Sequence, residues 1–204
     1  MSDRERAIQE WKAAGREELR FDYDLDESSV VVDAGGYAGQ WASDVVARFL
    51  CRVHVFEPVP DFAERIRTRF ARNPLVTVHA VGLAAQTREV PIALRGTGSS
   101  IVGGNGAAPT AVVPLVRAAD AFEGAGIERV DLIKVNIEGA EYELLEHLAD
   151  AGWIPRIRHL QVQFHDAGPG SDARMRALQS RLAETHELMW RHELVWESWR
   201  RRDP

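Results

Sequence analysis

The sequence predicts an α/β fold, with a mostly parallel, twisted sheet, helices on both of its faces and a small β-hairpin insertion. Two observations support this prediction. Short runs of β-branched residues alternate with segments in which apolar residues recur at helical spacing. A glycine-rich turn at residues 35–39 joins the first such run to the following segment, as in open sheets that bind ligands at the carboxyl ends of their strands.

The elements in the first half alternate regularly behind a helix expected over residues 3–19. We therefore expect a helical extension in residues 1–29 and one main domain in residues 30–204. Pro60 suits a first helical turn, and Asn73-Pro74 suits a helix end. The predicted elements are strand 30–32, helix 39–50, strand 53–56, a helix from Pro60 to the Asn73-Pro74 pair, and strand 75–81.

The alternation breaks between residues 87 and 118, where we expect a β-hairpin of 90–94 and 111–116 around a loop rich in glycine and serine. Alternation then resumes, and Ser171 is a candidate N-cap for the last helix. The later elements are strand 130–135, helix 139–149 closed by Gly152, strand 159–164, helix 172–186 and one or two strands in 188–199.

Charge and composition exclude several kinds of partner and cellular environment. The formal net charge is −6 without a broad basic field, so we expect no nucleic-acid partner. The single cysteine, Cys51, excludes a disulfide within the chain and suits a core position. No apolar run approaches the roughly 20 residues that cross a bilayer, and the charged N-terminus lacks the pattern of a signal peptide. We therefore expect a cytoplasmic location without membrane insertion.

The first candidate site is the turn after the first strand, with Asp33, Gly35, Gly36 and Gly39. This spacing does not match the glycines of a dinucleotide fingerprint. The Asp33 carboxylate would repel a pyrophosphate but can bind an ammonium group, and the following helix N-terminus can bind a carboxylate. S-adenosylmethionine (SAM) carries both groups, so the turn favours SAM over NAD. A glycine-rich turn without a ligand is the alternative.

The second candidate site is the end of the second strand. Glu57 lies about 20 residues after Gly35, the spacing at which an acid accepts hydrogen bonds from ribose hydroxyls. Phe56 or Pro58 could pack against an adenine ring. A solvated loop carboxylate is the alternative for Glu57.

The third candidate site follows strand 130–135 and contains Lys134, Asn136, Glu138 and Glu141. Methyl transfer needs an acceptor held in line with the donor, and a hydroxyl acceptor also benefits from a base. A lysine in a buried strand needs a partner, so Lys134 is either a site residue or half of an ion pair. The two glutamates could instead complement the dipole of the next helix.

The fourth candidate site is His165 with Asp166, after strand 159–164. Histidine has a reference pKa of about 6.5 and can act as a base near neutrality, and Asp166 could orient the ring. A structural or exposed histidine is the alternative. Together with Glu138 these residues could ligate a metal, but no spacing is diagnostic, and no metal site is predicted.

Taken together, these segments resemble the FkbM family of SAM-dependent methyltransferases. That family combines an acidic glycine loop, a strand end that reads FEP and a junction of the form DLIK-(I/V)-(D/N)-(V/I)-EG-(A/G)-E. The chain contains DAGGYAGQ, VFEPVPDF and DLIKVNIEGAEYELLEHL in that order, and the resemblance extends from about Val30 to His165. The tail LVWESW is similar to a branch of the family linked to polysaccharide and glycan gene clusters.

The resemblance implies a class I methyltransferase with a Rossmann-like fold and with SAM as its cofactor. It also implies O-methylation of a hydroxyl on a sugar or another small molecule, with Ser99-Ser100 in a loop over the acceptor. By this resemblance, SAM is bound by Asp33, Gly35, Gly36, Gly39 and Glu57, and the junction 134–141 lies beside the methyl-transfer centre.

One residue departs from the pattern. Many family members carry an aspartate where this chain has Asn136, and an amide cannot act as a general base. Either another residue takes the proton or no base is needed. The catalytic candidates are His165, Glu138, Lys134 and Asn136.

Two other functions stay open at this point. A nucleotide-binding oxidoreductase on the same fold would bind NADH and not SAM. A non-catalytic SAM-binding subunit, which Asn136 leaves open, would bind SAM and transfer no methyl group.

Overall fold

The computed structural model describes residues 3–93, 110–166 and 168–202. Within these residues the main sheet has seven strands: β1 (Val30–Ala34), β2 (Arg52–Phe56), β3 (Val76–His79), β7 (Val130–Val135), β8 (Ile157–Val162), β9 (His186–His192) and β10 (Trp196–Arg201). Their order is β3-β2-β1-β7-β8-β10-β9. The first five are mutually parallel, and β10 is antiparallel to both of its neighbours. The predicted mostly parallel sheet is confirmed.

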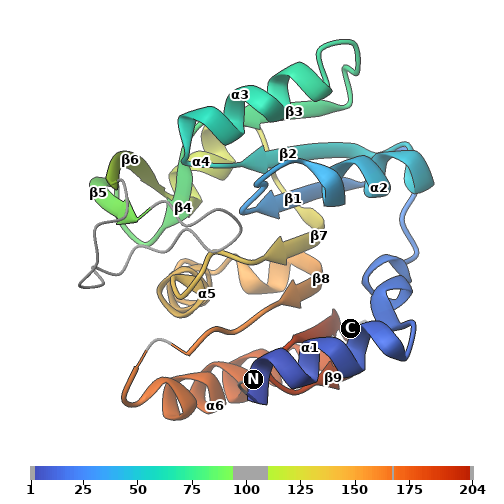
Figure 1. Cartoon of the computed structure of the whole chain (residues 1–204), viewed down its shortest axis with the longest axis vertical. Helices are drawn as coiled ribbons and strands as arrows, with labels where there is room; N and C mark the ends of the chain where they lie inside the picture. Colours follow the sequence, from blue (N-terminus) through green and yellow to red (C-terminus); the bar gives the residue numbers. More distant parts are fainter. Residues whose placement is uncertain (1–2, 94–109, 167, 203–204) are drawn as a thin grey trace.

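Helices cover both faces of this sheet (Figure 1). On one face, α2 (Gln40–Phe49) and α3 (Pro60–Arg69) pack Val45 and Ile66 against β1 and β2. On the other face lie α4 (Ala118–Gly124), α5 (Glu141–Asp150) and α6 (Ser171–Leu182), which contribute Phe122, Leu145 and Leu178 to a second cluster. The two clusters bury the sheet from both sides, which is why β7 is buried along its whole length.

The insertion forms a sheet of its own. β5 (Arg88–Ala93) and β6 (Thr110–Arg117) pair as the expected antiparallel hairpin, and β4 (Gly82–Ala84) adds a parallel strand that the sequence did not indicate. The short helix α4 follows β6 directly and was also not expected. Leu94 and the predicted Ser99-Ser100 loop lie outside the described residues.

The predicted N-terminal helix divides into two pieces. α1 (Asp3–Ala13) ends before Gly15, which has a φ of 65°, and a 3₁₀ helix follows at Arg16–Phe21. Trp11 is buried among residues of the C-terminal hairpin, including Trp196, and its ring lies 5.5 Å from that of Trp190. The N-terminal segment is thereby attached to strands β9 and β10.

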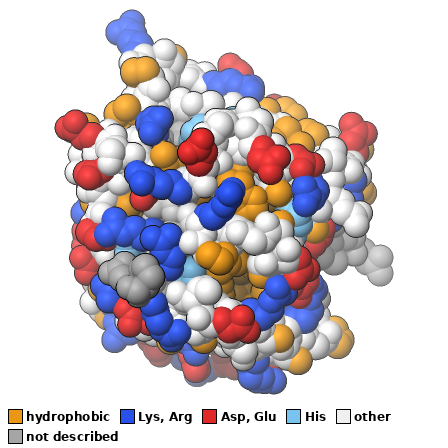
Figure 2. Space-filling model, turned by 180° about the vertical axis from the view of Figure 1, so that it is seen from behind, with side chains coloured by type: hydrophobic (Ala, Val, Ile, Leu, Met, Phe, Trp, Pro, Cys, Tyr) orange, Lys and Arg blue, Asp and Glu red, His pale blue; other side chains and the backbone are white. Residues whose placement is uncertain are grey.

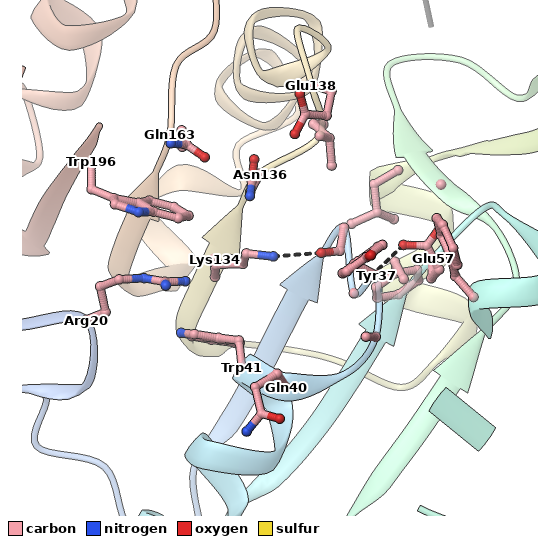
Figure 3. A pocket seen from close by; sticks show the side chains of 18 of the residues that line it. Arg20, Tyr37, Gln40, Trp41, Glu57, Lys134, Asn136, Glu138, Gln163 and Trp196 are labelled. Atoms are coloured by element: carbon pink, nitrogen blue, oxygen red, sulfur yellow. Dashed lines mark hydrogen bonds between the residues drawn. The ribbon is translucent and has the colours of Figure 1, made fainter. Parts of the chain in front are cut away.

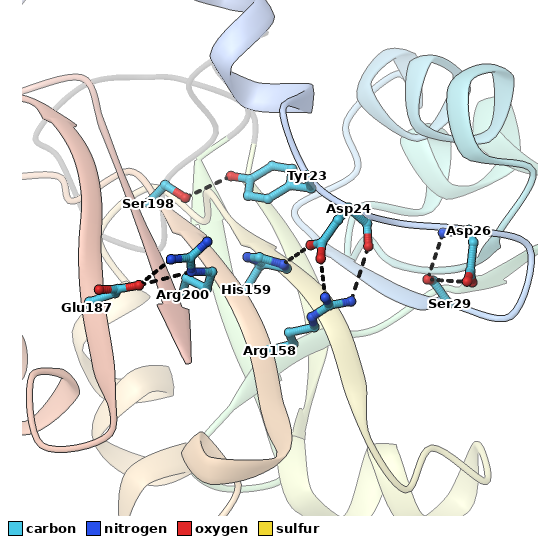
Figure 4. Close-up of polar contacts among 9 residues, drawn as sticks. All are labelled: Tyr23, Asp24, Asp26, Ser29, Arg158, His159, Glu187, Ser198 and Arg200. Atoms are coloured by element: carbon cyan, nitrogen blue, oxygen red, sulfur yellow. Dashed lines mark hydrogen bonds and ion pairs between the residues drawn. The ribbon is translucent and has the colours of Figure 1, made fainter. Parts of the chain in front are cut away.

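The connection from the 3₁₀ helix to β1 is also fixed to the sheet (Figure 4). Oδ1 of Asp24 lies 2.8 Å from Nε2 of His159, and Asp24 also pairs with Arg158. The hydroxyls of Tyr23 and Ser198 lie 3.1 Å apart. These contacts join the segment before β1 to β8 and β10.

Two predicted details of the last helix differ from the structure. Gly170 is the N-cap of α6, and Ser171 is its first helical residue, with its hydroxyl donating to Asp166. The helix ends at Leu182, before residue 186, because the chain turns there and enters β9. None of the described helices has the length and apolar character needed to cross a membrane.

Candidate active site

A cavity of about 860 Å³ opens where the strand order of the sheet reverses, at the carboxyl ends of β1, β2 and β7 (Figure 3). Ligands of open α/β sheets bind at such a reversal, and the volume is typical of small-molecule sites. The predicted site residues that line the cavity are Gly35, Gly36, Phe56, Glu57, Pro58, Lys134, Asn136 and Glu138. Asp33, Gly39 and His165 lie outside its lining.

Gly35 and Gly36 are required by close backbone packing at this reversal. Gly35 has a φ of 88°, and a Cβ atom there would lie 2.0 Å from the carbonyl oxygen of Asn136. A Cβ atom at Gly36 would lie 2.3 Å from Cγ1 of Val55. Side chains at these positions would collide with these neighbouring atoms, so glycine lets the turn pack closely against the ends of β7 and β2. Gly39 instead caps the N-terminus of α2.

Asp33 and Lys134 form a buried ion pair beneath the cavity. Nζ of Lys134 donates to Oδ1 of Asp33 over 2.9 Å and to the carbonyl oxygen of Gly35 over 2.7 Å. Burial raises the pKa of the Asp33 carboxyl, and the ammonium of Lys134 opposes that rise. Lys134 therefore combines both roles considered for it, as an ion-pair partner that also lines the cavity. Direct contact of Asp33 with the cofactor stays a prediction, since its carboxylate already binds this ammonium.

Glu57 connects the end of β2 to the glycine turn. Its Oε2 accepts a hydrogen bond from the backbone N–H of Tyr37 (2.8 Å), and its Oε1 accepts one from that of Val59 (2.9 Å). Burial raises the pKa of Glu57, and these two bonds oppose the rise. The preceding Phe56 stacks on His79 with ring centroids 4.4 Å apart. Each carboxylate oxygen of Glu57 keeps a lone pair for a ligand.

His165 lies between two glutamates. Its Nδ1 is 2.8 Å from Oε1 of Glu141, and its Nε2 is 3.4 Å from Oε2 of Glu138. Glu141 is fully buried and also accepts the backbone N–H groups of Ile137 and Gly139, so its position is fixed. Glu138 has a φ of 53°, an uncommon conformation for a residue with a side chain, and it lines the cavity.

The partner of His165 differs from the predicted one. Asp166 binds the backbone N–H of Gly168 and the hydroxyl of Ser171, and so helps to begin α6. Glu141 orients the imidazole instead. Its alternative role, complementing the dipole of α5, is compatible with this position at the first residue of the helix. Across the described segments, no group of three potential metal-binding side chains occurs.

The structure adds residues that the sequence did not indicate. Arg20, Trp41, Gln163 and Trp196 line the cavity, and they come from four separate elements or loops. Among the described residues, no hydrogen-bond partner lies near Nε of Arg20, Nε1 of Trp41 or Oδ1 of Asn136, although all three atoms are buried. Buried polar atoms in this state fit a ligand with both donors and acceptors, as the amino-acid portion of SAM has.

Comparison with known proteins assigns the family. The methyltransferase FkbM domain matches residues 33–185, which include the glycine turn, Glu57, the Lys134–Glu141 junction and His165. The comparison with curated proteins gives no match.

Solved structures of low sequence identity share the fold. An rRNA methylase from Streptococcus thermophilus has a TM-score of 0.55 at 11% identity, over 93% of this chain and 95% of that chain. A putative rRNA-methylase from Clostridium thermocellum has a TM-score of 0.57 at 10% identity, over 94% and 95%. Precorrin-6y C5,15-methyltransferase from Geobacter metallireducens GS-15 has a TM-score of 0.51 at 10% identity, over 92% and 87%.

These similarities correct one expectation. The absence of a nucleic-acid partner was inferred from the net charge, yet of two proteins that share this fold, one is described as an rRNA methylase and the other as a putative rRNA-methylase. Total charge is a poor guide because binding depends on where the charges lie. On the face in Figure 2, several Lys and Arg side chains lie close together at the left, and others are spread over the face among Asp and Glu. Nucleic acid is therefore not excluded as a partner.

The fold, the cavity where the strand order reverses and the matched domain all indicate a methyltransferase. The fold is that of the class I methyltransferases, and the family and fold together imply the use of SAM. This chain belongs to the FkbM family of methyltransferases.

Proposed function

We propose that this protein is a SAM-dependent O-methyltransferase acting on a hydroxyl group of a sugar or another small molecule. The observation that carries the proposal is a single cavity, where the strand order reverses, that is lined by the glycine turn, Glu57, Asn136 and Glu138. We assign the glycine turn and Glu57 to the nucleoside, and Asn136 and Glu138 to the acceptor.

The cofactor side is built from β1 and β2. Gly35 and Gly36 let the turn pack closely beside the cavity, and Glu57 has the oxygen lone pairs to accept hydrogen bonds from ribose hydroxyls. Phe56 and Pro58 line the same side and suit packing against a flat base. When bound, SAM supplies a methyl group on a positively charged sulfur.

The acceptor side contains the groups that would move a proton. A hydroxyl loses its proton when its oxygen is methylated, so a base in the cavity would accelerate the transfer. Glu138 lies there, and its carboxylate can take the proton. His165 can then accept it at Nε2, because its Nδ1 donates to Glu141. In this scheme Asn136 needs no base function and instead accepts a hydrogen bond from the acceptor.

Lys134 has a positioning role in this scheme. Its ammonium binds Asp33 and the carbonyl oxygen of Gly35, so it holds the glycine turn against β7. Asp33 acts through Lys134, and Gly39 acts by starting α2. These three residues would affect cofactor binding through the shape of the turn.

Methyl transfer from labelled SAM to a panel of acceptors tests the proposal. The panel contains sugars, nucleotide sugars, hydroxylated small molecules and RNA, and the product is analysed for the atom that carries the label. We expect an O-methylated product that disappears with Glu138→Gln. SAM binding without transfer to any acceptor would favour a non-catalytic subunit, and a label on nitrogen or carbon would contradict O-methylation.

A further inference from the structure

We propose that Arg20 and Trp41 form a binding subsite for a carboxylate group at the N-terminal side of the cavity. The proposal rests on the proposed function, since it assigns a part of the same ligand site. It gives the N-terminal segment, which lies outside the matched FkbM domain, a direct part in ligand binding.

The position of Arg20 is fixed from two sides. Its backbone carbonyl oxygen accepts a hydrogen bond from Nε2 of the buried Gln161 on β8 (3.2 Å). Its guanidinium lies over the ring of Trp196 on β10, with Cζ 4.3 Å from the ring centroid. The side chain is only 16% exposed. An arginine held in this way is preorganised, so little conformational entropy is lost when it binds a ligand.

Only some of the hydrogen-bond donors of the Arg20 guanidinium have partners within the described protein. One terminal nitrogen of Arg20 binds Oε2 of Glu17 over 3.2 Å, and Glu17 also accepts from the indole of Trp11. In the described part of the chain, Nε of Arg20 is buried and has no hydrogen-bond partner. A buried donor in this state costs free energy unless a ligand supplies the acceptor.

Trp41 offers a second donor of the same kind. It is 8% exposed and lines the cavity from the first turn of α2. Within the described residues, its buried Nε1 also has no partner. Phe21, the neighbour of Arg20, stacks on its ring with centroids 6.4 Å apart, so the 3₁₀ helix and α2 are in contact here.

The chemistry of the two donors favours a carboxylate. A guanidinium binds a carboxylate through charge-assisted hydrogen bonds, and an indole N–H is a donor without an acceptor function. Of the buried carboxylate of Asp33, Oδ1 binds Lys134, and within the described residues Oδ2 has no hydrogen-bond partner. The carboxylate can come from the amino-acid portion of the cofactor or from an acidic sugar acceptor, and the experiment distinguishes these sources.

Calorimetric titration of matched ligands tests the subsite. S-adenosylhomocysteine and its decarboxylated analogue are titrated into wild type, Arg20→Gln and Trp41→Phe. We expect each substitution to weaken S-adenosylhomocysteine about tenfold or more and the decarboxylated analogue less than about twofold. Arg16→Gln, an exposed residue of the same 3₁₀ helix, and Trp153→Phe, a tryptophan outside the cavity, are controls that should change neither affinity.

A second pair of probes tests whether the carboxylate comes from an acidic sugar acceptor. Glucuronate, and glucose as the matched sugar without a carboxylate, are titrated into the complex with S-adenosylhomocysteine. Loss of glucuronate binding in Arg20→Gln, with unchanged S-adenosylhomocysteine affinity, assigns the carboxylate to the acceptor and also supports the subsite. Equal weakening of both nucleoside ligands, or unchanged binding of every probe, overturns the proposal. If wild type binds neither nucleoside ligand, the proposed function fails as well.

Discussion

Asp33 and Lys134 are register partners on the neighbouring strands β1 and β7, and their side chains form an ion pair of 2.9 Å that is buried from solvent. The pair lies directly under the turn that carries Gly35. A buried pair contributes little net stability compared with apolar residues, but the loss of one member leaves an uncompensated charge.

Asp33→Ala should therefore destabilise the protein by about 3–5 kcal/mol, because the ammonium of Lys134 loses its partner. The double variant Asp33→Ala/Lys134→Met should recover most of this loss. Urea denaturation followed by circular dichroism measures both effects. A double variant no more stable than the single one would show that the pair is not the reason for the loss.

Gly35→Ala should destabilise the protein more than Gly126→Ala. Both residues have a positive φ, of 88° and 67°, so both substitutions cost about 1–2 kcal/mol of backbone strain. Only at Gly35 does the new Cβ meet the backbone oxygen of Asn136, and at Gly126 nothing described lies within 4 Å. The difference in unfolding free energy should be about 2 kcal/mol, and equal losses would argue against the close approach.

Glu57→Ala should weaken S-adenosylhomocysteine about tenfold to a hundredfold, because the ligand loses a charged acceptor and the Tyr37 backbone loses its hydrogen bond. Calorimetry measures the affinity directly. Glu64→Ala is a suitable control, since Glu64 is an exposed residue of α3 paired with Arg67. Equal affinities for both variants would remove Glu57 from the cofactor site.

His165→Ala should reduce turnover about 10²- to 10⁴-fold and leave S-adenosylhomocysteine affinity unchanged, because the imidazole acts behind Glu138 and outside the cavity lining. The measurement uses the acceptor found in the labelled-SAM screen. Asp166→Ala removes the other carboxylate next to His165 in sequence and should keep its activity. Full activity of His165→Ala would leave Glu138 as the base without a relay.

Stability should fall as the pH decreases from about 6.5 towards 4 because of His54. Burial, and to a smaller extent the charges of His79 and Arg52, lower the pKa of His54 to about 4, whereas the unfolded chain titrates near 6.5. In this interval the unfolded state binds a proton that the native state does not, so acid favours unfolding.

Urea midpoints at pH 7.5 and pH 5 check this prediction. His54→Gln should lose part of the acid sensitivity, and Arg67→Gln at an exposed position of α3 should retain it. An unchanged difference between the two pH values in His54→Gln would assign the sensitivity to other groups.

The sequence was most informative where each element carries its own pattern. Residues 130–135 were predicted as a buried strand from their short, mostly apolar run, and all six are buried in the structure. Pro60 marks the start of α3. β4 has three residues and α4 has seven, too few for a period to emerge. The sequence therefore predicted the hairpin of residues 87–118 but neither β4 before it nor α4 after it.

The site was predictable only where neighbours in space are neighbours in a motif. The glycine turn, Glu57 and the Lys134–Glu141 junction each belong to a short contiguous motif whose residue types indicate a ligand site. The contact of Arg20 with Trp196, and that of His165 with Glu141, depend on how distant segments pack. The spacing of apolar residues along the sequence does not indicate such contacts. Arg20 and the orienting role of Glu141 were therefore apparent only in the structure.

The burial of Trp11 against Val195 and Trp196 has a consequence for biosynthesis. During translation α1 leaves the ribosome long before β10, so the indole of Trp11 must wait, exposed to water and chaperones, while the intervening strands assemble. One wall of the ligand cavity therefore cannot form until residues 195 and 196 have emerged. A nascent chain that stalls before them would leave the indole of Trp11 without its packing partners, and such exposed apolar surface favours aggregation or proteolysis.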